Sequence, residues 1–496
     1  MRAGFHILGL LICAVALAAG PVRAQQPQDQ APPQTQDPNA SPENPSQPIP
    51  AIRSPLAGLN GNDQDQEGPQ KTLPDTTPLS SVENISIGKA PLDHNFIQPQ
   101  FKIFSTADSD GLSANGNPGW SNWTSFLGGI DLHDASGISN LKLSYLGGGT
   151  IAIGGTASDS VIQQLSLNES LNWQRTQLKF IDQFDLLPEA SFGYGGLGGG
   201  VGLPGGGSIG LQSGLTPGEG VLTTRGLRLS NTFLTEADVE LDPRSSITVA
   251  GGYSLLHYFD NDLLNTSDAV FQAGFNRQLT HKDTVAIFYR FTGYRYSGFD
   301  QSINDNSFQV SYARRVTGRL AFKIQGGPDL AFVKQPITTT TSTSSTPSSE
   351  NTQVLYWSFY TSVNYQLDRT GFEASYNHGI NGGSGVLAGA IANTVQGSAN
   401  RQLTRQLNGS AYFGYSHNTG LNGVSPSNLT IQSYGYWFGG VNFTRTLGRT
   451  LELNLVYLLQ HQTSNGTFLV GPTPNTDLTR QQITIGVTWQ RQPIPF

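Results

Sequence analysis

The sequence of 496 residues is poor in cysteine, methionine and charge. Cys13 is its one cysteine and Met1 its one methionine, and a single cysteine excludes a disulfide framework and any metal site built from several cysteines. Charged residues make up 13% of the chain, roughly half of the usual share in soluble globular proteins. That low charge excludes a coiled coil, and the mean hydropathy of −0.27 excludes a bundle of transmembrane helices. The net charge of −7 argues against a nucleic-acid partner.

Glycine and aromatic residues are the components in surplus. The chain holds 59 glycines among 496 residues, well above the background of about 7%. Aromatic residues reach 10% of the sequence. Low charge, many glycines and many aromatic residues together indicate a chain that alternates between lipid and water.

Residues 1–24 have the features of a secretory signal peptide. Arg2 supplies the positive charge, residues 7–19 are apolar, and Val22-Arg23-Ala24 fits a cleavage site. The apolar run is too short to span a bilayer as a helix of the mature protein. A lipoprotein anchored at Cys13 is the alternative, although Ile12 precedes that cysteine where a small residue is expected.

Residues 25–95 form a tail rich in Gln, Pro, Asp and Asn. It has nine acidic and three basic residues, so its charge is −6 (3 − 9). Its few aliphatic residues show no period, and we therefore expect the tail to be disordered. A spacer is its simplest role, and a tether to the cell wall or to a periplasmic partner is the alternative.

From about residue 120 onward, apolar and polar residues alternate with a period of two. Ile483, Ile485 and Val487, for example, alternate with Gln482 and Thr484. Such alternation predicts β-strands with one apolar and one polar face. No segment of this region has a convincing helical period.

The connections between the predicted strands alternate between short and long. A similar short turn recurs at 276–282, 313–319, 364–369, 400–405 and 444–449, and the longer loops are 193–222, 297–305, 335–352, 381–390, 418–431 and 463–478. This asymmetry predicts an up-and-down antiparallel barrel with short turns at one rim, unlike a soluble sandwich or propeller. We count 18 strands, or 16 if the first hairpin, which begins with a strand at 96–106, serves as a plug.

The signal sequence, the repeated turns, the alternation and the terminal aromatic residue Phe496 together resemble Gram-negative outer-membrane β-barrel proteins. The resemblance covers residues 96–496, is architectural, and points to no named family. It implies an all-β, transmembrane up-and-down β-barrel of 16–18 strands in the cell outer membrane. It also implies contact with outer-membrane lipid and assembly by the barrel-assembly machinery.

The C-terminus departs from the usual pattern of such barrels. The last strand is expected to end near residues 489–491, because Pro493 and Pro495 prevent regular pairing of residues 492–496. Our hypothesis is that segment 481–489 acts as the assembly signal, with Trp489 and Phe496 as its candidate aromatic residues.

The sequence offers little support for catalysis or for a bound cofactor. A G-x-G-x-x-G pattern occurs at 193–198, but the density of Gly and Pro forbids the helix that a dinucleotide site needs, so a surface loop that can fold over or into the pore is expected. The histidines are scattered without metal-ligand spacing. Ser416, His417 and Asn418 cannot form a triad among themselves, because adjacent strand residues point to opposite faces. We therefore predict no catalytic, cofactor or metal site, and no enzyme.

Polar residues at inward strand positions are the candidate pore-lining residues. They are Arg228, Gln272, Asn276, Arg290, Lys323, Glu373, Glu452, Asn454 and Gln460. They form no ladder of one sign, so strong ion selectivity is not predicted. We expect the aromatic residues near strand ends to form the interface girdles, namely Tyr253, Tyr258, Tyr289, Tyr294, Tyr296, Trp357, Tyr434, Tyr436, Trp437, Phe438 and Trp489. An alternative places Tyr294, Tyr296, Tyr434 and Tyr436 at a sugar-binding mouth.

The expected function is a passive, porin-like channel for small hydrophilic solutes, since barrels of this size enclose an aqueous path. A barrel component of a secretion or surface-polysaccharide export pathway, whose tail docks a periplasmic partner, is the first alternative. A structural or adhesive surface protein, plugged by loop 193–222 or by segment 96–119, is the second.

Overall fold

The computed structural model describes residues 95–110, 119–155, 158–188, 227–259, 264–297, 301–341, 344–382, 388–421, 433–465 and 477–496. The predicted signal peptide, the tail up to residue 94 and the glycine-rich loop 193–222 lie outside these residues. Within the described ranges, no helix is long and apolar enough to cross a membrane.

The described residues form strands joined by turns and loops. The strands are β1 (Phe96–Asp110), β2 (Gly119–Ser136), β3 (Ser139–Gly154), β4 (Ser160–Asn172), β5 (Thr176–Leu187), β6 (Arg228–Asp242), β7 (Ser245–Tyr258), β8 (Asn265–Gln278), β9 (Asp283–Ser297), β10 (Ser302–Thr317), β11 (Leu320–Thr341), β12 (Ser344–Gln366), β13 (Thr370–Asn381), β14 (Ala390–Gln402), β15 (Leu407–Gly420), β16 (Ser433–Leu447), β17 (Leu451–Asn465), β18 (Asp477–Gln490) and β19 (Ile494–Pro495).

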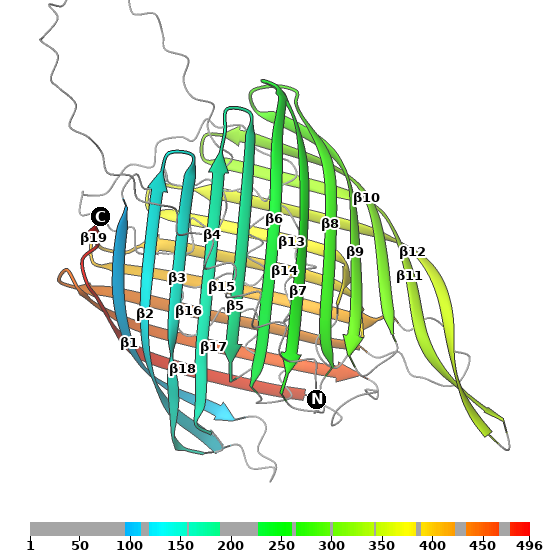
Figure 1. Ribbon diagram of the computed structural model, residues 1–496. Coiled ribbons are helices and arrows are strands. Elements are labelled where there is room, and N and C mark those ends of the chain that lie inside the picture. The colour runs from blue at the N-terminus through cyan, green and yellow to red at the C-terminus, as the bar shows by residue number, and fades with distance from the viewer. Residues whose placement is uncertain are drawn as a thin grey trace, which may run out of the picture. The chain divides into compact units, whose positions relative to one another are not determined.

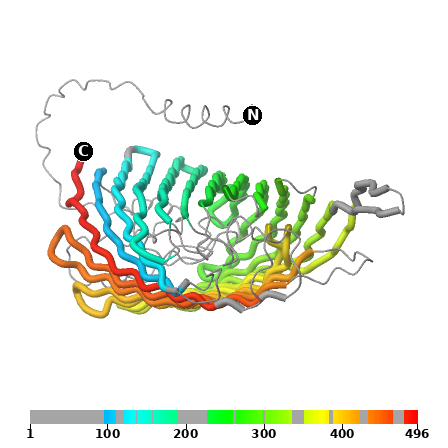
Figure 2. Tube along the Cα trace, turned by 90° about the horizontal axis from the view of Figure 1, so that it is seen from below, coloured from blue at the N-terminus to red at the C-terminus, as the bar shows by residue number. Residues whose placement is uncertain are grey.

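Strands β1 to β18 form a closed antiparallel barrel. Each strand pairs with the next along the chain, and β18 pairs with β1 from Gln490↔Gln100 to Gln482↔Asp108. Figure 1 shows β1 to β9 side by side in front, with the later strands crossing behind them, and Figure 2 shows the last strand beside the first. The up-and-down barrel is confirmed. Of the two predicted counts, 18 is right, because β1 is a full strand of the wall and no plug.

The short connections gather at one rim. They follow the even-numbered strands, as between β2 and β3 and between β16 and β17, whereas the longer connections follow odd-numbered strands. The exception is the short link between β11, which ends at Thr341, and β12, which begins at Ser344. Gly137 and Gly448 adopt φ values of 60° and 84° in two of the short turns. Side chains with a Cβ rarely take this left-handed conformation, so glycine is required there.

Two local expectations are corrected by the strand pairing. Segment 335–352 is no long loop, because β11 and β12 continue as a hairpin whose pairing runs to Thr341↔Ser344. This run of Thr and Ser suits an extended strand. After β18 ends at Gln490, the C-terminus pairs briefly with β1 through Ile494↔Ile97 and Pro495↔Phe96. This pairing forms although Ile494 lies between two prolines, Pro493 and Pro495.

The two faces of the barrel wall differ in chemistry. Large apolar side chains are exposed on one face, among them Ile287, Phe308, Leu453, Ile485 and Trp489. The other face carries buried polar residues in addition to small apolar clusters, one of which joins Ile181, Leu234, Ala250 and Val270. Because the side chains of a strand alternate between faces, the apolar face is the outside of the barrel and the polar face its inner wall.

Candidate functional site: the inner wall of the barrel

All nine candidate pore-lining residues lie on the inner wall. Gln272 and Asn276 alternate with Phe271 and Phe275, which are 46% and 42% exposed on the outside. Glu452 and Asn454 alternate in the same way with exposed leucines of β17. Arg228, Arg290, Lys323, Glu373 and Gln460 share the inward parity of their own strands. Whether water and solutes reach these side chains stays a prediction.

The fold brings some of these nine residues together and leaves others apart. Gln272 and Arg290 are cross-strand neighbours on β8 and β9. Asn276 Nδ2 donates a 3.1 Å hydrogen bond to Thr248 Oγ1, and Asn454 Nδ2 donates one of 3.2 Å to Thr488 Oγ1. Lys323 Nζ lies 5.8 Å from the centroid of the Tyr360 ring, within the range of a cation–π contact. The nine residues are therefore spread around the wall and form no single cluster.

A buried ion-pair network lies near the short-turn rim, on β5 and β6. Lys179 Nζ lies 2.9 Å from Glu236 Oε1 and 3.7 Å from Asp238 Oδ2. Thr248 Oγ1 donates a 2.5 Å hydrogen bond to the other oxygen of Asp238. Lys179 and Glu236 are almost completely buried, and a buried charge is tolerated when it is paired in this way.

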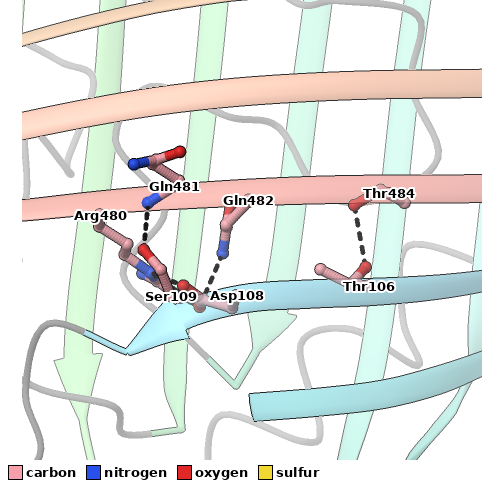
Figure 3. A network of polar contacts seen from close by, with 7 residues as sticks. All are labelled: Thr106, Asp108, Ser109, Arg480, Gln481, Gln482 and Thr484. Carbon is pink, nitrogen blue, oxygen red and sulfur yellow. Dashed lines mark hydrogen bonds and ion pairs between the residues drawn. The ribbon is translucent and has the colours of Figure 1, made fainter. Parts of the chain in front are cut away.

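A second charged network joins the first strand to the last, as Figure 3 shows. Arg480 Nε on β18 lies 3.0 Å and 2.8 Å from the two carboxylate oxygens of Asp108 on β1, and Nη2 of the same arginine also donates to Asp108. Gln482 Nε2 donates a 3.2 Å hydrogen bond to this carboxylate. The hydroxyls of Thr106 and Thr484 are 2.9 Å apart one row further along. We call these residues the seam network, since they link the strands whose pairing closes the barrel.

A neutral amide and hydroxyl network covers the inner wall of β10 to β12. Gln309 Nε2 donates 2.6 Å hydrogen bonds to the hydroxyls of Ser307 and Ser358. Gln325 Nε2 donates a 2.6 Å bond to Gln309 Oε1. These side chains are buried, so their mutual bonds satisfy groups that would otherwise be left without a partner.

The end of the β13–β14 hairpin leaves the wall and folds inward. β12 pairs with β13 only as far as Phe359↔His378, while β13 continues with β14 to Asn381. Beyond that point, Tyr296 Oη donates a 2.8 Å hydrogen bond to the carbonyl of Gly382, and Gln301 Nε2 donates one of 2.5 Å to that of Ala388. Ile380 packs in one cluster with inward residues of β9, β10 and β11. Since three strands separate β9 from β13 in the sheet, this hairpin tip reaches across the interior.

The expectation that the strand-end aromatics form girdles is wrong for six residues. Tyr258, Tyr294, Tyr296, Tyr434, Tyr436 and Phe438 are 1–7% exposed and lie on the inner wall. Tyr434, Tyr436 and Phe438 stack along β16 with successive ring centroids 6.2 Å apart. Phe438 lies where a Cβ of Gly414 would be, so this glycine makes room for the ring. Tyr253, Trp357 and Trp489 do lie outside, at 42–68% exposure.

Several charged residues of the inner wall were absent from the sequence-based set. They are Asp108, Lys179, Glu236, Asp238, Asp268, Asp305, Asp329 and Arg480. The signal for most of them was present, because charged residues inside an alternating strand have to face inward. Their pairing was not visible, since Asp108 and Arg480 lie 372 residues apart. In the part of the chain that the structure describes, no three His, Cys, Asp or Glu side chains converge to hold a metal ion.

Comparison with known proteins leaves the family open. No protein-family model and no curated protein matches this sequence. Among solved structures, OpdQ of Pseudomonas aeruginosa is 11% identical over 81% of this chain and 98% of its own, with a TM-score of 0.39. OccK2 (OpdF) of Pseudomonas aeruginosa, solved with glucuronate, is 9% identical over 80% and 99%, with a TM-score of 0.40. OccAB4 of Acinetobacter baumannii is 8% identical over 80% and 99%, with a TM-score of 0.39. At these values the likeness carries no argument, so the barrel assignment rests on the strand pairing.

Proposed function

We propose that this barrel spans the bacterial outer membrane and acts as a passive channel for small hydrophilic solutes. The observation that carries the proposal is the inverted distribution of side chains, apolar on the outside of a closed barrel and polar on its inner wall. A soluble barrel would present polar residues to the solvent, whereas a lipid-embedded one presents an apolar band and keeps water for the lumen.

The outer surface supports the lipid-facing part of this proposal. On β18 the outward positions Ile483, Ile485, Val487 and Trp489 are each 39–54% exposed. Each lies opposite an apolar residue of β17, as in Ile485↔Leu455, so the band continues from strand to strand. The band ends at Gln481, where the side chain accepts a 3.3 Å hydrogen bond from Tyr457 Oη. If the barrel stood in water instead of lipid, this whole apolar band would be exposed to water, at a large free-energy penalty.

The inner wall supports passage and not catalysis. An 18-strand barrel has the diameter at which an aqueous path is usual. The neutral network around Gln309 and the paired charges around Lys179 make the inner wall polar, as a water-filled path requires. The tail as a periplasmic docking segment and the barrel-assembly machinery as a partner remain parts of the proposal.

Single-channel recording of the full-length secreted chain in planar bilayers tests this function. We expect steady conductance steps from folded protein, recognised by its faster gel migration without boiling, and none from the same sample after boiling. Folded protein that gives no steps would overturn the channel and favour a plugged structural or adhesive barrel. A chain that shows no heat-dependent gel shift and remains in the soluble fraction would overturn the membrane barrel itself.

A further inference from the structure

Three carboxylates lie on the loop-side half of the inner wall, on strands β8, β10 and β11. They are Asp268 on β8, Asp305 on β10 and Asp329 on β11, and their exposed fractions are 4%, 2% and 1%. Asp329 is the cross-strand partner of Ser307, two residues from Asp305, so these two acids are diagonal neighbours at about 7–8 Å between Cα atoms. On its other side, Ser307 is the cross-strand partner of Arg290 on β9. The positive charge of Arg290 acts on Asp305.

Each of these three acids has at least one carboxylate oxygen without a hydrogen bond in the described part of the chain, as do Glu236 and Asp238, which pair with Lys179. Both oxygens of Asp329, and Oδ1 of Asp268 and of Asp305, accept no hydrogen bond from the described residues. By contrast, Asp185 accepts bonds of 2.9 Å from two glutamines, and Asp131 accepts one of 2.9 Å from Gln100. A charged carboxylate buried without hydrogen bonds is strongly unfavourable unless a cation compensates it or it takes up a proton.

Gln272 is an independent sign that a ligand belongs here. It lies on the same face of β8 as Asp268, opposite Arg290, and is 1% exposed. Neither its amide oxygen nor its amide nitrogen has a hydrogen-bond partner among the described residues. A buried primary amide normally has such partners, so its two free groups fit the polar atoms of a bound molecule.

The surroundings narrow the chemical class of that molecule. Tyr294 is the cross-strand partner of Asp268, and its ring is buried against Gly382 of the hairpin tip. The three carboxylates do not converge as metal ligands in the described structure. Spaced carboxylates and the amide of Gln272 suit an organic cation with ammonium or guanidinium groups better than a metal ion.

We propose that the inner wall at Asp268, Asp305 and Asp329 binds small organic cations and makes the barrel selective for them. The proposal rests on the channel function above and names its solute class. The inward hairpin tip lies directly over this site, since a Cβ on Gly382 would come within 3.3 Å of Asp268 Oδ1.

The test compares 1,4-diaminobutane, a dication, with succinate, a dianion of the same chain length, on the full chain. In planar bilayers we expect diaminobutane to block the potassium current at least tenfold more strongly than succinate does. The Asp305→Asn/Asp329→Asn variant should lose that difference. Asp368→Asn removes one carboxylate at the rim, where the side chain is 55% exposed, and should change the block less than twofold.

Calorimetric titration of diaminobutane into detergent-purified protein separates this proposal from the channel function. Binding without conductance would keep the cation site and overturn the channel. Conductance with equal block by both probes, or with an unchanged block in the double variant, would overturn the cation site alone. Folding of the double variant is checked by gel mobility, and the single variant Asp329→Asn replaces it if the double variant does not fold. A single variant that binds diaminobutane as tightly as the parent chain would also contradict the proposal.

Discussion

The seam network should contribute more to stability than any ion pair at the rim of the barrel. The side chains of Asp108 and Arg480 are 0% and 9% exposed, and the arginine donates to both carboxylate oxygens. Asp108→Asn leaves the guanidinium charge buried opposite a neutral amide, and breaking a buried pair in this way costs about 3–5 kcal/mol. The matched control is Asp368→Asn, which breaks a 2.6 Å pair with Arg319 whose side chains are 44% and 55% exposed. We expect it to cost about 0–1 kcal/mol, because water already screens that pair.

Urea titration in lipid vesicles measures both losses, provided that the unfolding and refolding curves coincide. The double variant Asp108→Asn/Arg480→Gln should recover part of the loss, since no charge is then left buried. Equal losses for Asp108→Asn and Asp368→Asn would refute the reasoning that burial at the seam sets the strength of the pair. A double variant less stable than Asp108→Asn would show that Arg480 stabilises the seam through contacts other than its charge pair.

Three further predictions concern the seam, the hairpin tip and assembly. Gly486→Val should destabilise the barrel by about 1–3 kcal/mol, because the Phe104 ring lies where its Cβ would be, and Phe104→Ala should relieve the loss in the same urea titration; no relief would contradict this contact. Tyr296→Phe removes the hydroxyl that donates to Gly382 and should speed hydrogen exchange at the tip about fivefold, which corresponds to about 1 kcal/mol in the free energy of local opening. The control Tyr289→Phe loses a 2.7 Å bond to Asn306 in the wall and should leave exchange at the tip unchanged. Trp489→Ala should lower the amount of assembled barrel more than Phe496→Ala, because Trp489 is paired with both Phe101 and Leu451; an unchanged amount for Trp489→Ala would reject segment 481–489 as the assembly signal.

The positions of the inward residues show how far alternation reaches and where it stops. Placing Arg290 on the inner wall also places Tyr294 and Tyr296 there, because all three share one parity on β9. Their nearness to a strand end was a weaker guide and led to the girdle assignment that the structure corrects. The surplus of glycine likewise has a place beyond the loops, since Gly414 and Gly486 lie beneath aromatic rings of neighbouring strands.

The sequence by itself determined the barrel, its two faces and the rim that carries the short turns, because these depend on residues close together in the chain. A period of two sets the face of every side chain, and turn length sets which strands are neighbours. The tertiary structure alone decided the strand count, the pairing of Asp108 with Arg480, the inward fold of the hairpin tip and the carboxylate oxygens left without hydrogen bonds. Each of these depends on how distant strands register once the barrel has closed, and no local pattern encodes that register.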